Sequence, residues 1–437
     1  MTTRREDHQP RTAGGAEQQA RRIYLQTFGC RANQYDTEAV RAMIEAAGSE
    51  IVASPEDADA AVFNSCAVTA DAVADLRQQV RGAARRNESL RSVVMGCAAG
   101  LEGDTRTEIA ALPTVQAIVP GADIDAIAEA IGMARGRGLA ASRQSGARAL
   151  LRIQDGCDEH CTFCATTIAR GAHRSREADA LVAEAAALAE HHGEIVLTGV
   201  HIGGWGRELG TSLGVLVERL VRDVPRVRFR LTSIEATEVD DRLRELITGV
   251  PGRIAPHLHA PLQSGSDRLL RRMGRHWYTA RRYAAAVERI VGAASVFALG
   301  GDVITGFPGE QEEDHEQTVA LVRSLPFTSL HVFPYSARPG TAADRLPQLV
   351  SGRVARARAA ELRDLAALKA EAHVRARAGG SADVVVIREG DAGRGLTEDY
   401  LDVALAGAVP PRARRFGATL SLRNGALVAE ARDALGR

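Results

Sequence analysis

The chain has 437 residues, a formal net charge of zero at pH 7, 45% hydrophobic residues and 25% charged residues. This length exceeds that of one ordinary core, and a prior of about 150 residues per domain predicts roughly three domains. The balanced charge excludes the overall basic field that would by itself predict nucleic-acid binding, so a polyanionic partner has to meet a local patch.

Residues 1–20 are polar, rich in Arg, Gln and Gly, and without periodicity, which is typical of a disordered tail. They lack the apolar core of a signal peptide, and the sequence has no run of about 18 uncharged apolar residues. We therefore expect a cytoplasmic protein without a membrane partner. In a reducing compartment its six cysteines favour metal binding or catalysis over structural disulfides.

An amino-terminal domain is predicted over residues 21–135, where short apolar runs alternate with helical stretches. This rhythm is typical of a parallel α/β sheet. Residues 136–147, rich in Gly and Arg, have the composition of a linker. The predicted strands carry the sequences IYLQTFGC, AAVFNSCAV, SVVMGCAA and VQAIVP, and the predicted helices cover residues 38–47 and 75–87.

A second domain is predicted over residues 148–375, with six strand-like runs at intervals of about 30 to 45 residues. This interval fits successive βα units, and six units predict an open (β/α)6 barrel with its chemistry at the carboxyl ends of the strands. Residues 376–437 carry short strand patterns that predict a small all-β barrel, which we interpret as an RNA-binding domain. The six barrel runs are ALLRIQDG, EIVLTGV, VRFRLTSIE, HLHAPLQSG, FALGGDVITGFPGE and SLHVFPYSARPGT.

The segment QDGCDEHCTFC holds Cys157, Cys161 and Cys164 in a C-x3-C-x2-C spacing just after the first barrel strand. Three thiolates on one short loop can hold three irons of a [4Fe–4S] cluster and leave the fourth iron open. An open coordination position is typical of a catalytic metal site. The alternative is a zinc knuckle, although zinc requires a fourth ligand and His160 lies inside the loop itself.

The other three cysteines, Cys30, Cys66 and Cys97, each come directly after an apolar strand. The carboxyl ends of parallel strands meet at one edge of a sheet, so the three thiols are expected to converge there. We interpret them as ligands of a second [4Fe–4S] cluster, again with one open iron. For any one of them taken alone, a small buried core residue is the alternative.

Together these motifs resemble the radical S-adenosylmethionine methylthiotransferase family over residues 23–341, and the carboxy-terminal tail is similar to the family's TRAM domain. The variants NQYDTE, LTGVHIGGWG and HVFPYSARPGT most resemble the threonylcarbamoyladenosine tRNA methylthiotransferases. The other segments that carry the resemblance are TFGCRANQYDTE, FNSCAVTADA, MGCAAG, QDGCDEHCTFC, HLHAPLQSGSDRLLRRMGR and DVITGFPGE.

The resemblance implies a division of labour between the clusters. The Cys157, Cys161 and Cys164 cluster would cleave S-adenosylmethionine, and the other, auxiliary cluster would carry the sulfur that is methylated and delivered. The product would be a 2-methylthio nucleoside at position 37 of tRNA, next to the anticodon. The implied partners are the anticodon loop of tRNA, an electron donor and a sulfur source. A radical route is consistent with an aromatic C–H, which has no acidic proton for a base to remove.

The resemblance also implies further site residues. Gly193 and Glu194 would receive the amino group of S-adenosylmethionine, and Phe163 would meet its adenine or else pack within the loop. Three arginines after the cysteine loop would bind tRNA phosphates or else begin a solvated helix. The expected cofactor-binding residues at strand ends are Thr198, Ser233, Glu235 and Gln263, and the three arginines are Arg170, Arg174 and Arg176.

Cysteine spacing alone leaves other functions open. A methylthiotransferase for isopentenylated adenosine in tRNA, or for an aspartate of a ribosomal protein, would have the same barrel and clusters. From another class, a non-catalytic iron–sulfur or zinc protein could bind RNA through the carboxy-terminal tail alone. Reductive cleavage of S-adenosylmethionine would exclude the last of these.

Overall fold

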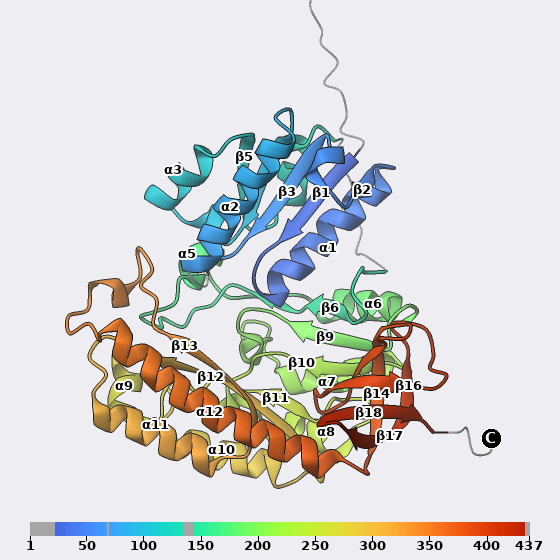
Figure 1. The fold of residues 1–437 in the computed structure, drawn as a ribbon, viewed down its shortest axis with the longest axis vertical. Helices are drawn as coiled ribbons and strands as arrows, with labels where there is room; N and C mark the ends of the chain where they lie inside the picture. Colours follow the sequence, from blue (N-terminus) through green and yellow to red (C-terminus); the bar gives the residue numbers. More distant parts are fainter. Residues whose placement is uncertain (1–21, 68–69, 134–142, 433–437) are drawn as a thin grey trace, which may run out of the picture.

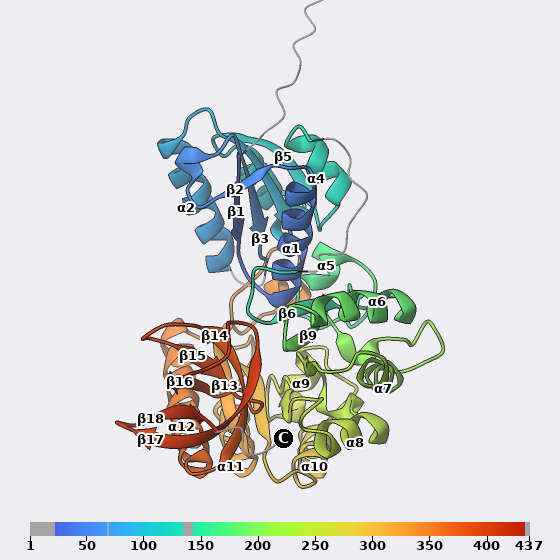
Figure 2. The same ribbon diagram turned by 90° about the vertical axis from the view of Figure 1, so that its right-hand side faces the viewer.

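The structure, a computed structural model, describes residues 22–67, 70–133 and 143–432 (Figure 1). The predicted disordered tail lies outside these residues, as does most of the predicted linker. An amino-terminal α/β domain stands above a larger half-open barrel, and a small closed β-barrel packs at the side of the larger one (Figures 1 and 2). None of the helices in the described part of the chain is long and apolar enough to cross a membrane.

The amino-terminal domain contains a five-stranded parallel sheet in the order β2-β1-β3-β4-β5. One face packs against α1 and α4 through Val40, Ile44 and Ile127, and the other against α2 and α3 through Leu76 and Ile109. The predicted α/β class is therefore confirmed, and β2 is an additional short edge strand. The elements are β1 (Arg22–Thr27), α1 (Arg31–Ala46), β2 (Glu50–Val52), β3 (Ala60–Ser65), α2 (Ala70–Arg86), β4 (Arg91–Gly96), α3 (Asp104–Ala110), β5 (Val115–Pro120) and α4 (Ile124–Ala130).

The larger barrel has two parallel three-stranded sheets, β10-β9-β6 and β11-β12-β13. Isolated bridges from Phe229 to Ile254 and from Ser233 to His259 join them, which gives the open six-stranded arrangement predicted from the sequence. The strands are β6 (Ala149–Arg152), β9 (Glu194–Thr198), β10 (Arg228–Leu231), β11 (His257–His259), β12 (Ala298–Thr305) and β13 (Phe327–Pro334).

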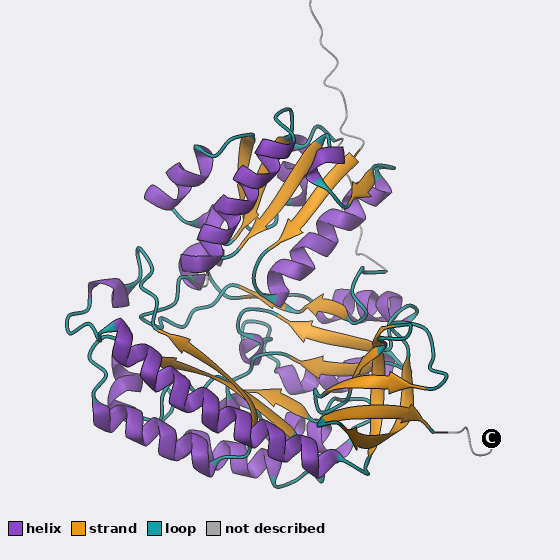
Figure 3. Cartoon of the chain, viewed as in Figure 1, coloured by secondary structure: helices purple, strands orange, loops and turns teal. Residues whose placement is uncertain are grey.

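Helices cover the outside of this barrel, and the long helix α12 runs along β13 (Figure 3). Their apolar faces pack with the strands into one large core that contains Trp205, Phe229 and Tyr283. The covering helices are α6 (Ala178–Ala189), α7 (Leu213–Asp223), α8 (Asp241–Gly249), α10 (Ala280–Val291), α11 (Glu312–Ser324) and α12 (Gly352–Arg377). The loops contain β7 (Gln154–Asp155), α5 (Thr166–Arg170), β8 (Arg174–Ser175) and α9 (Asp267–Arg272).

The carboxy-terminal strands close into a barrel in the order β14-β15-β16-β18-β17. Val384, Val403 and Leu420 fill its interior. Closure leaves no free sheet edge, as expected for a small all-β module that packs against a larger domain. The strands are β14 (Ser381–Arg388), β15 (Arg394–Leu396), β16 (Asp402–Ala406), β17 (Arg415–Arg423) and β18 (Ala426–Ala431).

A buried ion network joins the two barrels at the amino end of β9. Glu194 is fully buried and pairs with Arg228 at 2.5 Å and with Arg230 at 2.8 Å. Arg228 also pairs with Asp383 of β14 at 3.1 Å, and Arg230 donates to the Thr397 carbonyl oxygen at 3.0 Å. Burial alone would raise the pKa of Glu194, but the two arginines hold it well below its ordinary value. The carboxylate is therefore a structural ion that fixes the small barrel in place.

Replacing this carboxylate should destabilise the protein. In Glu194→Gln, the buried Arg230 loses its carboxylate partner and Arg228 keeps only Asp383. Breaking a buried ion pair in this way costs about 3–5 kcal/mol. We expect a clearly lower thermal unfolding midpoint, measured by circular dichroism. The exposed Glu190 on the neighbouring helix end gives the matched control Glu190→Gln, which should unfold like wild type. Equal midpoints for both variants would contradict this account of the network.

Candidate active site

The amino-terminal cysteines gather at one edge of the sheet, because Cys30, Cys66 and Cys97 follow the neighbouring parallel strands β1, β3 and β4. Asn33, in the first turn of α1, lies among them: its Oδ1 is 3.5 Å from Cys97 Sγ and 3.9 Å from Cys30 Sγ. A Cβ atom at Gly29 would lie 2.5 Å from Cys66 Sγ, so only glycine fits where β1 turns toward α1. Three thiols at one sheet edge, two of them beside the same amide oxygen, are a suitable ligand set for a soft metal centre.

Arg170, at the end of α5 in the barrel, reaches this edge of the amino-terminal sheet. Its Nε donates to Cys97 Sγ at 3.1 Å, and its Nη2 donates to Asn33 Oδ1 at 2.7 Å and to Asp36 Oδ2 at 2.8 Å. Its Nη1 donates to Asp155 Oδ1 in the barrel at 3.0 Å. The side chain is only 3% exposed. One buried cation therefore connects the amino-terminal cysteines to the segment that carries the barrel cysteines.

The barrel cysteines lie on the loop between β7 and α5, directly below that edge. All six cysteines of the chain are free thiols. The loop is held against the barrel by backbone hydrogen bonds from Cys157 to Gly171 and from Thr162 to Met273. Each barrel thiol has its own polar neighbour: Thr166 Oγ1 lies 3.0 Å from Cys164 Sγ, Arg275 Nη1 lies 3.4 Å from Cys161 Sγ, and His201 Nδ1 lies 4.0 Å from Cys157 Sγ.

Cys97 and Cys161 have matching electrostatic surroundings, because each thiol lies beside an arginine. Burial raises the pKa of Cys97 to about 12 and that of Cys161 to about 12. The positive charge of Arg170 opposes this rise at Cys97, and that of Arg275 does so at Cys161. Metal ligation requires the thiolate, so each arginine favours the form that a cluster would need.

A single cavity of about 460 Å³ extends between the two cysteine groups. Cys97 lines it from the amino-terminal domain and Cys164 from the barrel loop, while Phe163, Ile304 and Phe333 provide apolar walls. This volume is typical of sites for small molecules or single nucleosides. Its polar lining consists mainly of Asp71, Thr166, Gln263, Asp302, Tyr335, Ser336 and Arg338.

Several buried polar atoms in and beside this region have no hydrogen-bond partner among the described residues. They are Glu235 Oε2, Tyr335 Oη and Arg338 Nε. Arg275 pairs with the other oxygen of Glu235 and also contacts Cys161, so Glu235 lies close to the barrel thiols. Unpaired buried polar atoms cost free energy unless a ligand satisfies them. They fit a cofactor with amino, carboxylate and hydroxyl groups, as S-adenosylmethionine has.

Some residues expected from the sequence do lie at this site. Phe163 and Gln263 line the cavity, and Gln263 has a φ of +63°, which directs its backbone away from the regular strand path. Thr198 is buried at the carboxyl end of β9, and Ser233 is bridged to β11 at His259. Their assignment to the cofactor stays a prediction.

The expectation for Gly193 and Glu194 does not fit the structure. Both residues lie at the amino end of β9, whereas the cysteine loop lies at the carboxyl ends of the strands. The Glu194 carboxylate is paired with Arg228 and Arg230. The Gly193 amide donates to the Ala413 carbonyl oxygen of the small barrel at 2.7 Å. At the carboxyl end of the same strand, the amides of Val200 and His201 donate to Gln154 instead.

The three arginines expected to bind phosphate have different environments. Arg170 is buried at Cys97, as described above, so it is not available to tRNA. Arg176 is paired with Glu184 at 2.7 Å and donates to Tyr35 Oη at 3.1 Å, which makes it a structural residue between the domains. Only Arg174 is exposed, with 60% of its side chain accessible, and it stays a candidate for phosphate.

Sequence reasoning missed Asn33, Asp36, His201, Arg275 and Arg338. Asn33 and Asp36 are three residues apart and lie on the buried face of α1. Helical periodicity after Cys30 could have predicted that they share this face. No pattern in the sequence predicts the role of His201. Burial would lower the pKa of His201, but hydrogen bonds with Cys157 and Glu238 raise it to about 10. Only the folded chain brings those partners together.

Comparison with known proteins matches this arrangement. The family model described as "Uncharacterized protein family UPF0004" matches residues 22–120, and that of the "Radical SAM superfamily" matches residues 151–322. The threonylcarbamoyladenosine tRNA methylthiotransferase MtaB of Aquifex aeolicus is 32% identical over 88% of this chain and 97% of its own length. The chain belongs to the radical S-adenosylmethionine methylthiotransferase family. It is accordingly a transferase that acts on tRNA, with two [4Fe–4S] clusters and S-adenosylmethionine as cofactors.

Relatives within this methylthiotransferase family carry two different names. MtaB of Bacillus subtilis is 35% identical over 76% of this chain and 77% of its own length. The tRNA-2-methylthio-N(6)-dimethylallyladenosine synthase of Cereibacter sphaeroides is 33% identical over 79% of this chain and 83% of its own length. Among solved structures, the radical S-adenosylmethionine methyltransferase TsrM of Kitasatospora setae has a TM-score of 0.51 at 15% identity, over 74% of this chain and 75% of that one. This last likeness is one of fold.

The paired arginines predict a pattern of thiol reactivity in the metal-free methylthiotransferase. A thiol with a pKa of about 12 is ionised to about one part in ten thousand at pH 8, so Cys97 and Cys161 should be alkylated slowly, and faster as the pH rises. Arg170→Gln removes a charge that lowers the pKa of Cys97, so it should slow alkylation there and not at Cys161. Arg275→Gln should do the reverse.

Mass spectrometry after timed iodoacetamide treatment measures the rate at each cysteine. The two variants control for each other, because both lose an arginine next to a buried thiol. Faster labelling of Cys97 in Arg170→Gln would mean that the arginine mainly closes the interface, and it would contradict the electrostatic role.

Proposed function

We propose that this methylthiotransferase places a methylthio group on carbon 2 of N6-threonylcarbamoyladenosine at position 37 of tRNA. The observation that carries the proposal is the single cavity that reaches both cysteine groups, because the chemistry requires both at one substrate. Relatives named for threonylcarbamoyladenosine, among them the Aquifex aeolicus and Bacillus subtilis proteins, support this nucleoside. Isopentenyladenosine is the second candidate, supported by relatives such as that of Cereibacter sphaeroides.

Each cysteine group has a distinct part in this proposal. Cys157, Cys161 and Cys164 would hold the cluster that binds S-adenosylmethionine, and the three amino-terminal thiols would hold the auxiliary cluster. When bound, these groups supply the radical and the methylthio chemistry that an unactivated aromatic C–H needs. The arginines at Cys97 and Cys161 would keep the ligating sulfurs anionic and oriented.

The remaining residues bind, orient and exclude water. Phe163, Ile304 and Phe333 offer apolar surfaces for the adenine ring, and Gln263 and Arg338 offer hydrogen bonds at its edges. A base of the anticodon loop must leave its stack to enter such a cavity, as in other enzymes that modify bases. An electron donor and a sulfur source are the further partners that this chemistry requires.

Iron content tests the cysteine assignment. Anaerobically reconstituted wild type should contain roughly eight irons per chain, and the triple variant Cys30→Ala, Cys66→Ala, Cys97→Ala roughly four. The variant should keep the ability to cleave S-adenosylmethionine, measured as 5′-deoxyadenosine, and lose methylthio transfer. About four irons in both proteins would show that the amino-terminal thiols bind no cluster.

The nucleoside is tested with two anticodon stem-loop RNAs that differ only at position 37. One carries threonylcarbamoyladenosine and the other isopentenyladenosine, and the product is measured by mass spectrometry of the digested RNA. We expect the 2-methylthio product from the first RNA and little from the second. Preferential turnover of the isopentenyl RNA would overturn the proposed nucleoside while leaving the enzyme class unchanged.

A further inference from the structure

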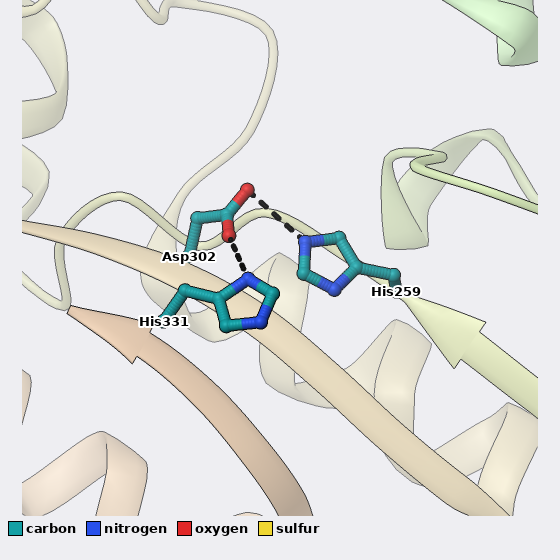
Figure 4. A group of neighbouring side chains, drawn as sticks. All are labelled: His259, Asp302 and His331. Atoms are coloured by element: carbon teal, nitrogen blue, oxygen red, sulfur yellow. Dashed lines mark hydrogen bonds and ion pairs between the residues drawn. The ribbon is translucent and has the colours of Figure 1, made fainter. Parts of the chain in front are cut away.

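Three side chains from neighbouring strands meet on the inner face of the barrel (Figure 4). His259 of β11 and His331 of β13 flank Asp302 of β12, with His259 Nε2 3.1 Å from one carboxylate oxygen and His331 Nδ1 3.2 Å from the other. Register places Asp302 directly beside His331. A Cβ atom at residue 300 would lie 2.8 Å from His259 Nδ1, so Gly300 leaves room for that ring. We call this group the His–Asp–His cluster.

The cluster lies at one end of the active-site cavity. Asp302 lines the cavity itself, and so do Ile304, Phe333 and Tyr335, which share its face of β12 and β13 because side chains alternate along a strand. His331 contacts Phe333, with ring centroids 6.2 Å apart. Tyr335 directly follows β13 and is four residues after His331, or about 13 Å at the usual rise per residue. The cavity thus reaches from the thiols to the Asp302 carboxylate, which the two histidines contact from outside the lining, with apolar walls between.

His331 offers a hydrogen-bonding nitrogen beside the cavity. Both oxygens of Asp302 are already occupied by the two histidines, and the hydrogen bond from Asp302 raises the pKa of His331 above its ordinary value. Burial and the positive charge of Arg31 oppose this rise. His331 Nε2 has no partner in the described part of the chain, and 63% of the side chain is exposed. Because Nδ1 faces Asp302, Nε2 can donate a hydrogen bond when the ring is protonated, a form that the raised pKa favours.

We infer that the His–Asp–His cluster binds the carboxylate of the amino-acid group on N6 of the substrate nucleoside, with His331 donating to that carboxylate and Asp302 positioning the ring. This inference rests on the proposed function. A threonylcarbamoyl group ends in a carboxylate, whereas an isopentenyl group is a hydrocarbon without any hydrogen-bonding atom. A charge-assisted hydrogen bond at this end of the cavity therefore discriminates between the two nucleosides, while the chemistry at the thiol end is the same for both.

Two histidines and one carboxylate are also a ligand set for a divalent transition metal. The candidate ligand atoms lie within 4.8 Å of one another. The contacts of 3.1 and 3.2 Å suit hydrogen bonds from the imidazoles to the carboxylate, and they would equally suit ligands around one ion. Metal content is therefore one of the measurements.

The test uses the reconstituted full-length enzyme and three stem-loop RNAs. One carries threonylcarbamoyladenosine at position 37, the second its methyl ester, in which the carboxylate is neutral, and the third isopentenyladenosine. Affinity is measured by fluorescence anisotropy and turnover by mass spectrometry, for wild type, His331→Gln and Asp302→Asn. His191→Gln, which changes an exposed histidine on the outside of the barrel, is the matched control.

Wild type should bind and convert the free acid, and esterification should weaken binding by about 10- to 100-fold, the usual effect of losing a hydrogen bond to a charged group. His331→Gln should weaken binding of the acid by a similar factor and barely change binding of the ester. Asp302→Asn should act in the same direction, and His191→Gln should match wild type. Cluster content should be unchanged in His331→Gln, which checks that the variant folds.

Other results would overturn the inference. Equal binding of acid and ester by wild type would show that the carboxylate is not recognised. Equal losses on acid and ester in His331→Gln would show that the residue supports the fold of the cavity. Zinc or iron beyond the two clusters, lost in His331→Gln, would show a metal site instead. Failure of the proposed nucleoside is seen separately, as turnover by wild type of the isopentenyl RNA and not of the free acid.

Discussion

The geometry of this enzyme depends on one buried cation, Arg170. Its guanidinium group is shared between Cys97 and Asp36 of the amino-terminal domain and Asp155 of the barrel. A buried guanidinium without counter-ions would cost several kcal/mol; Asp155 supplies one counter-ion within the barrel, and docking of the amino-terminal domain adds Asp36. The relative position of the cysteine groups is therefore fixed by charge as well as by packing. A small apolar contact of Ala67 and Leu101 with the α5 region closes the same interface.

The small barrel is fixed at a second junction. Tyr400 stacks on His257 of the large barrel, with ring centroids 4.7 Å apart. The guanidinium of Arg230 lies 5.0 Å from the centroid of the Tyr400 ring. Arg31, the residue next to Cys30, donates to the Tyr400 hydroxyl. Three domains thus meet at one aromatic side chain. RNA held by the small barrel would consequently keep a fixed relation to the cavity, because no flexible joint separates the two.

Periodicity predicted most of the fold, and strand ends predicted where the thiols gather. Apolar runs marked every barrel strand, and cysteines directly after β1, β3 and β4 had to meet because parallel strands share one edge. The expectation that Glu194 binds the cofactor was wrong because the sequence shows only that this residue belongs to a strand. The folded barrel shows that Glu194 begins β9, at the end opposite to the cysteine loop. Asn33 and Arg170 are 137 residues apart, and no local pattern predicts that their side chains meet.

The two ends of the cavity have different roles in the proposed reaction. In the proposed reaction, both cysteine groups and their arginines would serve the step at carbon 2, which is the same whatever substituent the adenine carries. At the other end, β11, β12 and β13 present side chains that no cluster requires, so they are free to differ with the substituent. Because the strands of a parallel barrel hold both ends on one rigid scaffold, selectivity can change there without disturbing the metal sites. Relatives of similar identity that are named for different nucleosides are consistent with this separation.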